Sequence, residues 1–206
     1  MRPLRWLLYS SIVASVVMAS IAGYFYFQFY QPMIGSEVVV LEVERSNETR
    51  SMEIDIRRTA LIVIDLWNPL PDDRVEKVNR LLDMARAHDI PIFILNHGID
   101  GDPRINTTGT NTIEHAVDIY SGTDFCHSAL QDAGITTLLY TGFEFNGCMI
   151  ARPCGVIPMY YKGYNLVVIS DVSKVDGYDR HEHAEYMLET MWASTTTLDK
   201  LEKALS

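Results

Sequence analysis

The chain has 206 residues, of which 48% are hydrophobic and 21% are charged, and its 17 Lys and Arg against 27 Asp and Glu give a formal net charge of −10. This balance excludes an unstructured tail and a basic nucleic-acid-binding protein, so no nucleic-acid partner is expected. Arg2 and Arg5 are the only charged residues before Glu37, so residues 37–206 carry 15 basic and 27 acidic side chains, a net charge of −12.

The first feature along the chain is an apolar segment over residues 6–30, which contains no charged side chain. A helix needs roughly 20 apolar residues to cross the ~30 Å hydrocarbon core of a bilayer, and this segment is long enough. Aromatic residues favour the membrane–water interface, and here Trp6 and Tyr9 mark one end while the run 24–30 marks the other. We therefore predict a transmembrane helix over 6–30 and a lipid bilayer as its partner.

Two alternatives remain open for this segment. The basic start, the apolar centre and Ser20-Ile21-Ala22 before Gly23 resemble a cleaved signal peptide, and a hydrophobic packing helix would have a similar composition. The apolar run continues beyond Gly23, which favours an anchor. Because positive charge near a membrane helix stays in the cytoplasm, Arg2 and Arg5 place residues 1–5 there. The domain that follows is predicted to lie on the periplasmic or extracytoplasmic side of a single-pass protein.

The remainder is divided into a linker over 31–57, which contains a candidate edge strand over 38–43, and one domain over 58–206. Short, continuous apolar runs recur in this domain, as expected for strands covered on both faces, at 59–64, 90–95, 136–141 and 166–169. Apolar residues at helical spacing lie between them, over 75–85 and over 125–133 before Gly134. This order predicts a three-layer, doubly wound α/β domain with a mostly parallel sheet.

Open parallel sheets form their sites at the carboxyl ends of strands. Asp65 directly follows the run 59–64, where partial desolvation would suit a general base, although a turn cap is the alternative. Cys148 follows the run 136–141 and a glycine-containing turn, so it is predicted at a helix N-terminus, where the dipole favours a thiolate and backbone N–H groups can bind an oxyanion. The alternative for Cys148 is a small buried hydrophobe.

These blocks together resemble the isochorismatase-like cysteine hydrolases, which include nicotinamidases and N-carbamoylsarcosine amidohydrolases. The resemblance extends from residue 58 to about 195, and it rests on 59–68, 134–142, Cys148 and the run from Lys162-Gly163-Tyr164 to Ser170-Asp171. It implies a parallel-sheet α/β fold and cleavage of a C–N bond in a small amide, or of a vinyl ether. Residue by residue, it implies Cys148 as the nucleophile and Asp65 as its acid/base partner.

The chain departs from this family where a catalytic lysine is expected, because it has no lysine between Lys77 and Lys162. Such an ammonium helps to hold the negative charge of the thiolate and of the developing oxyanion. The corresponding segment 113–121 offers Glu114, His115 and Asp118 instead. An acid there would oppose thiolate formation, whereas His115 is a candidate substitute if it is protonated or placed as a base.

Three further positions are candidates for substrate binding. Phe145 stands where the family usually has threonine, and Trp67 stands where it often has glutamine. Arg152 follows Cys148 by one helical turn and is suited to bind a substrate carboxylate bidentately, or to pair with Glu144. Two prolines further along, Pro153 and Pro158, are expected to interrupt the helix that begins at Cys148.

No metal and no cofactor are expected. The acidic and histidine residues of 97–102 do not reproduce the Asp-x-His pattern of the metal-binding family members, and His181 and His183, two residues apart, would face different directions on a helix. Three cysteines, Cys126, Cys148 and Cys154, are too few for a disulfide scaffold, and the odd count leaves at least one thiol free or paired with another chain.

Two functional hypotheses follow. The missing lysine, Phe145 and the prolines favour a degenerate domain that serves as a binding or structural subunit of a membrane complex, or as a homo-oligomer. Asp65 and Cys148 favour the alternative, an active cysteine hydrolase that acts on a small amide. Dinucleotide binding is excluded because no Gly-x-Gly-x-x-Gly follows a strand.

Overall fold

The structure is a computed structural model, and it describes residues 36–96, 101–112, 121–143, 146–173 and 181–206. The predicted membrane helix over 6–30 lies outside these residues, as do His115 and Phe145. Within the described ranges, no helix is long and apolar enough to cross a membrane. The described residues from Glu37 onward form one compact unit.

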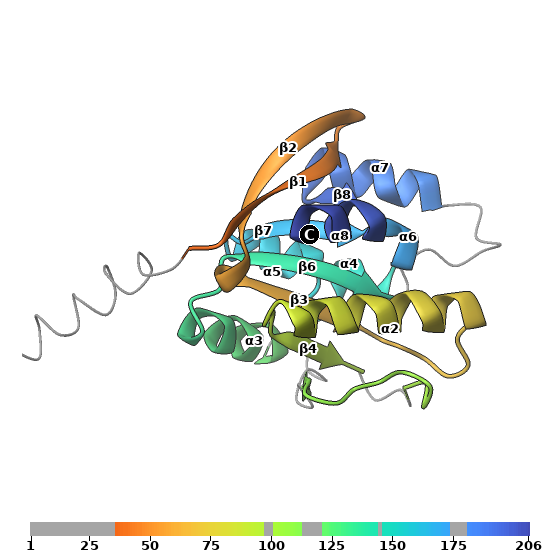
Figure 1. The fold of residues 1–206 in the computed structure, drawn as a ribbon. Helices are drawn as coiled ribbons and strands as arrows, with labels where there is room; N and C mark the ends of the chain where they lie inside the picture. Colours follow the sequence, from red (N-terminus) through yellow and green to blue (C-terminus); the bar gives the residue numbers. More distant parts are fainter. Residues whose placement is uncertain (1–35, 97–100, 113–120, 144–145, 174–180) are drawn as a thin grey trace, which may run out of the picture. The chain divides into compact units, whose positions relative to one another are not determined.

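The described strands form a mixed, eight-stranded sheet in the order β2-β1-β8-β7-β6-β3-β4-β5 (Figure 1). Their bounds are β1 Val38–Arg45, β2 Glu48–Asp55, β3 Thr59–Ile64, β4 Ile92–Leu95, β5 Asn111–Thr112, β6 Thr137–Gly142, β7 Asn165–Ile169 and β8 Ser194–Thr196. Strands β3 to β8 pair in parallel, and β1 pairs antiparallel with both β8 and β2. The predicted edge strand over 38–43 is therefore an internal strand, and β2 forms the edge.

Helices cover both faces of this sheet. Their bounds are α2 Asp72–Ala87, α3 Ser121–Asp132, α4 Cys148–Ala151, α5 Val156–Tyr161, α6 Ser170–Ser173, α7 His181–Met191 and α8 Leu198–Leu205, and a short 3-10 turn spans Ile56–Arg58. Apolar residues of α2, α6 and α8 pack in one core layer, and those of α3, α4, α5 and α7 pack in the other. The predicted three-layer, mostly parallel α/β fold is confirmed for the described domain.

The alternating side chains of β3 explain why both layers form. Leu61 and Val63 belong to the layer with α2, while Ala60, Ile62 and Ile64 belong to the opposite layer. All of these side chains are fully buried, as the continuous apolar run predicts for a strand covered on both faces.

Two helical predictions need correction. Phe125 shares the helical spacing of α3, but its side chain is exposed, and Cys126 and Leu130 provide the buried face instead. Pro158 does not interrupt a helix, because it lies in the first turn of α5, where a missing N–H removes no helical hydrogen bond. The break occurs only at Arg152 and Pro153, after which Cys154 and Gly155 lead into α5.

The chain order of the parallel strands creates a switch point between β3 and β6. From β3 the chain continues through β4 and β5 on one side, and it then returns to β6, β7 and β8 on the other. Gly142 ends β6 with φ +133°, and a Cβ at this position would lie 2.0 Å from the carbonyl oxygen of Ile64. The Phe143 N–H donates to the same carbonyl at 2.8 Å. Only glycine allows the ends of β6 and β3 to approach this closely.

We expect Gly142→Ala to lower the free energy of unfolding by about 3 kcal/mol or more, because both the positive φ and the contact with Ile64 oppose a side chain. Gly134→Ala is the matched control: Gly134 also has a positive φ, +71°, but no atom lies within 4 Å of the added Cβ, so a loss of about 1 kcal/mol is expected. Urea unfolding measures both. Equal losses would contradict the role given to the strand contact.

Candidate active site

Asp65 lies at the switch point, directly after β3. Its side chain is fully buried, and its backbone has φ +51°, a left-handed conformation that ends the strand. The Asp65 N–H donates to the carbonyl oxygen of Leu95 at 2.8 Å, and the Asp65 carbonyl accepts from the Trp67 N–H at 3.0 Å. The chain therefore bends sharply at Asp65 and holds this carboxyl group at the carboxyl edge of the sheet, where such sites form.

Cys148 reaches the same edge from β6. After Phe143 the described chain resumes at residue 146, and Gly147 precedes Cys148, which is half-buried and begins α4. The helix has only four residues, so the strong dipole expected from a regular helix is not available to Cys148. The charge that would support a thiolate must therefore come from a side chain.

Arg152 supplies such a charge. Its backbone N–H donates to the Cys148 carbonyl at 3.0 Å, which closes one helical turn, and its guanidinium lies beside the Cys148 side chain. Interaction with the Cys148 side chain raises the pKa of Arg152 above its usual value; desolvation opposes the shift, and the Coulombic attraction of Cys148 and Asp65 adds to it. The structure thus brings Asp65, Cys148 and Arg152 together.

Trp67 follows Asp65 by two positions. Its ring is partly exposed and meets the buried ring of Phe143 edge-to-face, with 6.3 Å between the centroids. Trp67 also forms an isolated β-bridge with Gly101, and the Leu66 carbonyl accepts from the Asp102 N–H at 2.9 Å. The loop after β3 is therefore held by a second segment, residues 101–105.

Asp102 and Arg104 fix that contact, and sequence reasoning did not single out this pair. The buried Asp102 carboxylate accepts from the Leu70 N–H at 2.8 Å and from the Arg104 guanidinium at 2.9 and 2.7 Å. Arg104 also donates to the Leu70 carbonyl and to Asp72. The hydrogen bonds from Arg104 hold the pKa of Asp102 well below its usual range, against the effect of burial. The only sequence signal is an Asp and an Arg flanking one proline.

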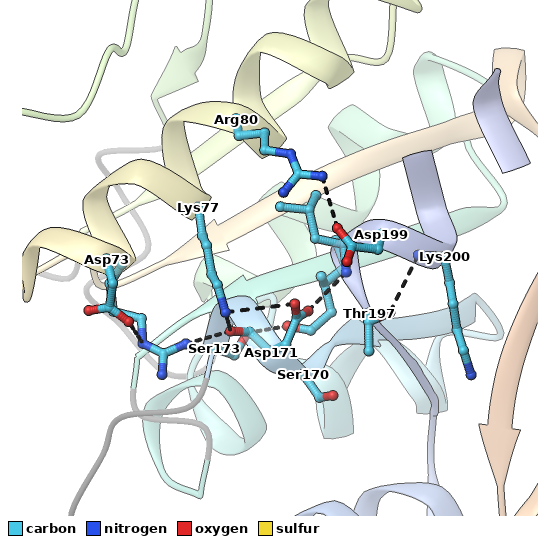
Figure 2. Close-up of polar contacts among 12 residues, drawn as sticks. Asp73, Lys77, Arg80, Ser170, Asp171, Ser173, Thr197, Asp199 and Lys200 are labelled. Carbon is cyan, nitrogen blue, oxygen red and sulfur yellow. Dashed lines mark hydrogen bonds and ion pairs between the residues drawn. The ribbon is translucent and has the colours of Figure 1, made fainter. Parts of the chain in front are cut away.

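A second polar network lies at the carboxyl end of β7 (Figure 2). Lys77 donates to the Asp171 carbonyl at 3.2 Å, and Arg74 donates to the same oxygen. The Asp171 side chain accepts from the Leu198 N–H at 2.9 Å, at the start of α8. Asp171, which belongs to one of the blocks that carry the family resemblance, therefore connects α6 with α2 and α8.

In the part of the chain that the structure describes, no group of three His, Cys, Asp or Glu residues is placed to hold a metal ion. The carboxylate oxygens of Asp102 are engaged by Arg104 and Leu70.

Comparison with solved structures identifies the class of fold. An isochorismatase family protein from Burkholderia thailandensis matches with a TM-score of 0.57 and 24% identity over 72% of this chain and 96% of its own. A cysteine hydrolase from Pseudomonas syringae matches with a TM-score of 0.55 and 16% identity over 73% of this chain and 95% of its own. An N-carbamoylsarcosine amidase from Thermoplasma acidophilum matches with a TM-score of 0.53 and 17% identity over 68% of this chain and 96% of its own.

The described domain therefore has the fold of the isochorismatase-like cysteine hydrolases. At these identities the likeness defines the fold, and function must be argued from the site. No protein-family model and no curated protein sequence matches the chain.

The Asp102 carboxylate gives the fold a pH dependence that can be measured. Because its folded pKa is depressed, Asp102 contributes stability above the unfolded value of about 3.9, and this contribution is lost as the pH falls toward the folded pKa. We expect Asp102→Asn to destabilise the chain more at pH 7 than at pH 3 in urea unfolding. Asp132→Asn, at an exposed position, is the control. An Asp102→Asn effect that does not change with pH would contradict the assignment.

Proposed function

We propose that the domain is a cysteine hydrolase that cleaves the C–N bond of a small amide, with Cys148 as the nucleophile and Asp65 as the acid/base partner. The observation that carries this proposal is the position of the Arg152 guanidinium, which lies beside the Cys148 side chain and within Coulombic range of Asp65. A cation next to a thiol favours the thiolate, and in this chain Arg152 takes the place of the family lysine.

The chemistry follows from these three groups. Asp65 takes the thiol proton, the Cys148 sulfur attacks the amide carbonyl carbon, and Arg152 faces the negative charge that develops. Asp65 then returns the proton to the leaving nitrogen as the C–N bond breaks, which leaves a thioester on Cys148. Water attacks this thioester with Asp65 as the base, and the Cys148 thiol is restored.

Arginine and lysine are not equivalent in this position. A guanidinium stays charged at any working pH and has a planar, fixed set of donors, whereas a lysine can also give up a proton. Arg152 therefore acts as a permanent cation, and proton transfer is left to Asp65. The same guanidinium is suited to contact a substrate carboxylate. Trp67, two positions after Asp65 and partly exposed, is the candidate for an apolar contact with the substrate.

A degenerate domain that binds a partner is the second candidate function. It is favoured by the absence of a lysine between Lys77 and Lys162 and by the four-residue length of α4, which limits the helix dipole at Cys148. In that case the domain would serve as a subunit of a membrane complex or as a homo-oligomer, and Cys148 would not turn over any amide.

Turnover of small amides by the full chain separates the two candidates. We expect activity on at least one amide, its complete loss in Cys148→Ala and Asp65→Asn, and a loss of about 100-fold in kcat/KM in Arg152→Gln. The charge-matched control is Arg50→Gln, which removes an exposed guanidinium on β2 and is expected to leave kcat/KM unchanged.

Arg152→Lys keeps a cation with a different geometry, and we expect an intermediate rate from it. Activity that survives in Cys148→Ala would contradict the proposed nucleophile. A correctly folded wild-type chain that turns over no amide across a broad panel would favour the degenerate domain instead.

We also propose that residues 6–30 anchor the chain in a membrane, with residues 1–5 in the cytoplasm and the domain on the extracytoplasmic side. The support is the uncharged, aromatic-flanked segment that follows Arg2 and Arg5. The intact chain is expected to stay in the membrane pellet after alkaline carbonate extraction and to be digested by protease added to intact cells. N-terminal sequencing that finds a mature chain beginning at Gly23 would overturn the anchor and establish a cleaved signal peptide.

A further inference from the structure

Two of the three cysteines lie together in the core. Cys126 is on α3 and Cys154 is in the bend between α4 and α5, and both side chains are fully buried in the same core layer. The Cys154 sulfur lies 3.5 Å from the carbonyl oxygen of Gly122, one helical turn before Cys126. The two cysteine side chains therefore meet at the contact between α3 and the bend, and interaction with Cys126 is the first cause of the shifted pKa of Cys154.

The bend that carries Cys154 is tightly constrained. Cys154 has φ +62°, a left-handed conformation that costs energy for a residue with a side chain. Gly155 follows it, and a Cβ at Gly155 would lie 2.7 Å from the carbonyl oxygens of both Met149 and Arg152. The Tyr140 hydroxyl donates to the Cys154 carbonyl at 2.8 Å. These constraints hold the Cys154 side chain against α3.

The surroundings of the pair suit an uncharged group. Interaction with Cys126 and burial raise the pKa of Cys154 far above its usual value, so the reduced Cys154 side chain stays an uncharged thiol. Burial also raises the pKa of the neighbouring Tyr140, with a smaller contribution from the two cysteines. A disulfide carries no charge and needs no hydrogen-bond partner, so this apolar core can accommodate it without a desolvation cost.

We propose that Cys126 and Cys154 form a disulfide under oxidising conditions and that Cys148 remains the free thiol. The oxidant is a small-molecule or protein disulfide, and it reacts before the core closes around the pair. One cysteine thiolate attacks this disulfide and releases one thiol; the second cysteine attacks the mixed disulfide, forms the Cys126–Cys154 bond and releases the other. Two protein thiols are oxidised, one external disulfide is reduced, and the protons go to the released thiols.

This pairing links the oxidation state of the core to the candidate site. Arg152 and Cys154 belong to the same bend, so a bond from Cys154 to α3 fixes the segment from which the Arg152 guanidinium reaches Cys148. The pairing uses two of the three cysteines and leaves the Cys148 thiol free to react. It does not depend on Cys148 being a nucleophile, and an extracytoplasmic location would supply the oxidising conditions.

Peptide mapping of the wild-type chain tests the pairing directly. The full chain is refolded in detergent with a mixture of reduced and oxidised glutathione, its free thiols are alkylated, and it is cleaved before Asp and after Met. These cleavages separate the cysteines, because Cys126 falls in peptide 124–131, Cys148 in 132–149 and Cys154 in 150–159. We expect most of the chain to yield 124–131 linked to 150–159, with Cys148 alkylated. A link that involves Cys148, or no link, would overturn the proposal.

Thermal unfolding gives an independent readout. Oxidised wild-type chain is expected to unfold about 5 °C or more above the reduced chain, because the bond restricts the unfolded state. Cys148→Ser is the matched control and is expected to keep both the linked peptides and this difference. In the Cys126→Ala, Cys154→Ala double variant the oxidised and reduced samples are expected to unfold at the same temperature. A difference that persists in the double variant would contradict the pairing.

Discussion

The close approach of β6 to the end of β3 is the constraint on which the candidate site depends. Gly142 allows it, because any side chain there would collide with the carbonyl of Ile64. The approach occurs at the switch point of the sheet, where the chain adds β4 and β5 on one side of β3 and β6, β7 and β8 on the other. Asp65 leaves β3 and the chain to Cys148 leaves β6 at this same edge. A carboxyl group and a thiol that are 83 residues apart in the sequence thus come to one place.

The positive potential at Cys148 does not come from a helix dipole, as it would at the start of a regular helix. Because α4 ends after four residues, the dipole contributes little, and the guanidinium one turn after Cys148 provides a positive charge beside the thiol. The break at Arg152 and Pro153, which in the sequence argues against an active site, ends the helix at the residue that then contacts the thiol. The same break leads to the bend in which Cys154 faces Cys126.

Much of the fold could be predicted because its strands are continuous apolar runs. The run 59–64 coincides with β3, and the spacing of Val78, Leu81 and Leu82 follows the buried face of α2. Strands β2 and β8 were missed because β2 is rich in charged and polar residues on a sheet edge and β8 has only three residues. Both depend on tertiary pairing, which local pattern does not reveal.

The candidate site was predictable only in part, for a similar reason. Asp65 and Cys148 follow strands directly, so strand position was sufficient to select them. The contact of Arg152 with Cys148 depends on where α4 ends, and the Asp102–Arg104 pair depends on how the 101–105 segment folds onto Leu66 and Leu70. Sequence spacing places Arg152 one helical turn after Cys148 and predicts a substrate carboxylate or Glu144 as its partner, whereas the contact with the Cys148 side chain is not visible in the sequence.

The central claim is that Arg152 supports a reactive Cys148, and the rate at which iodoacetamide alkylates Cys148 at pH 7 tests it most directly. In a Cys126→Ala, Cys154→Ala background only Cys148 can react, so one rate constant is measured. We expect Arg152→Gln to lower this rate about tenfold and Arg50→Gln to leave it unchanged, because only the first removes the charge next to the sulfur. An equal rate in the Arg152→Gln and parent chains, with both chains folded, would contradict the account.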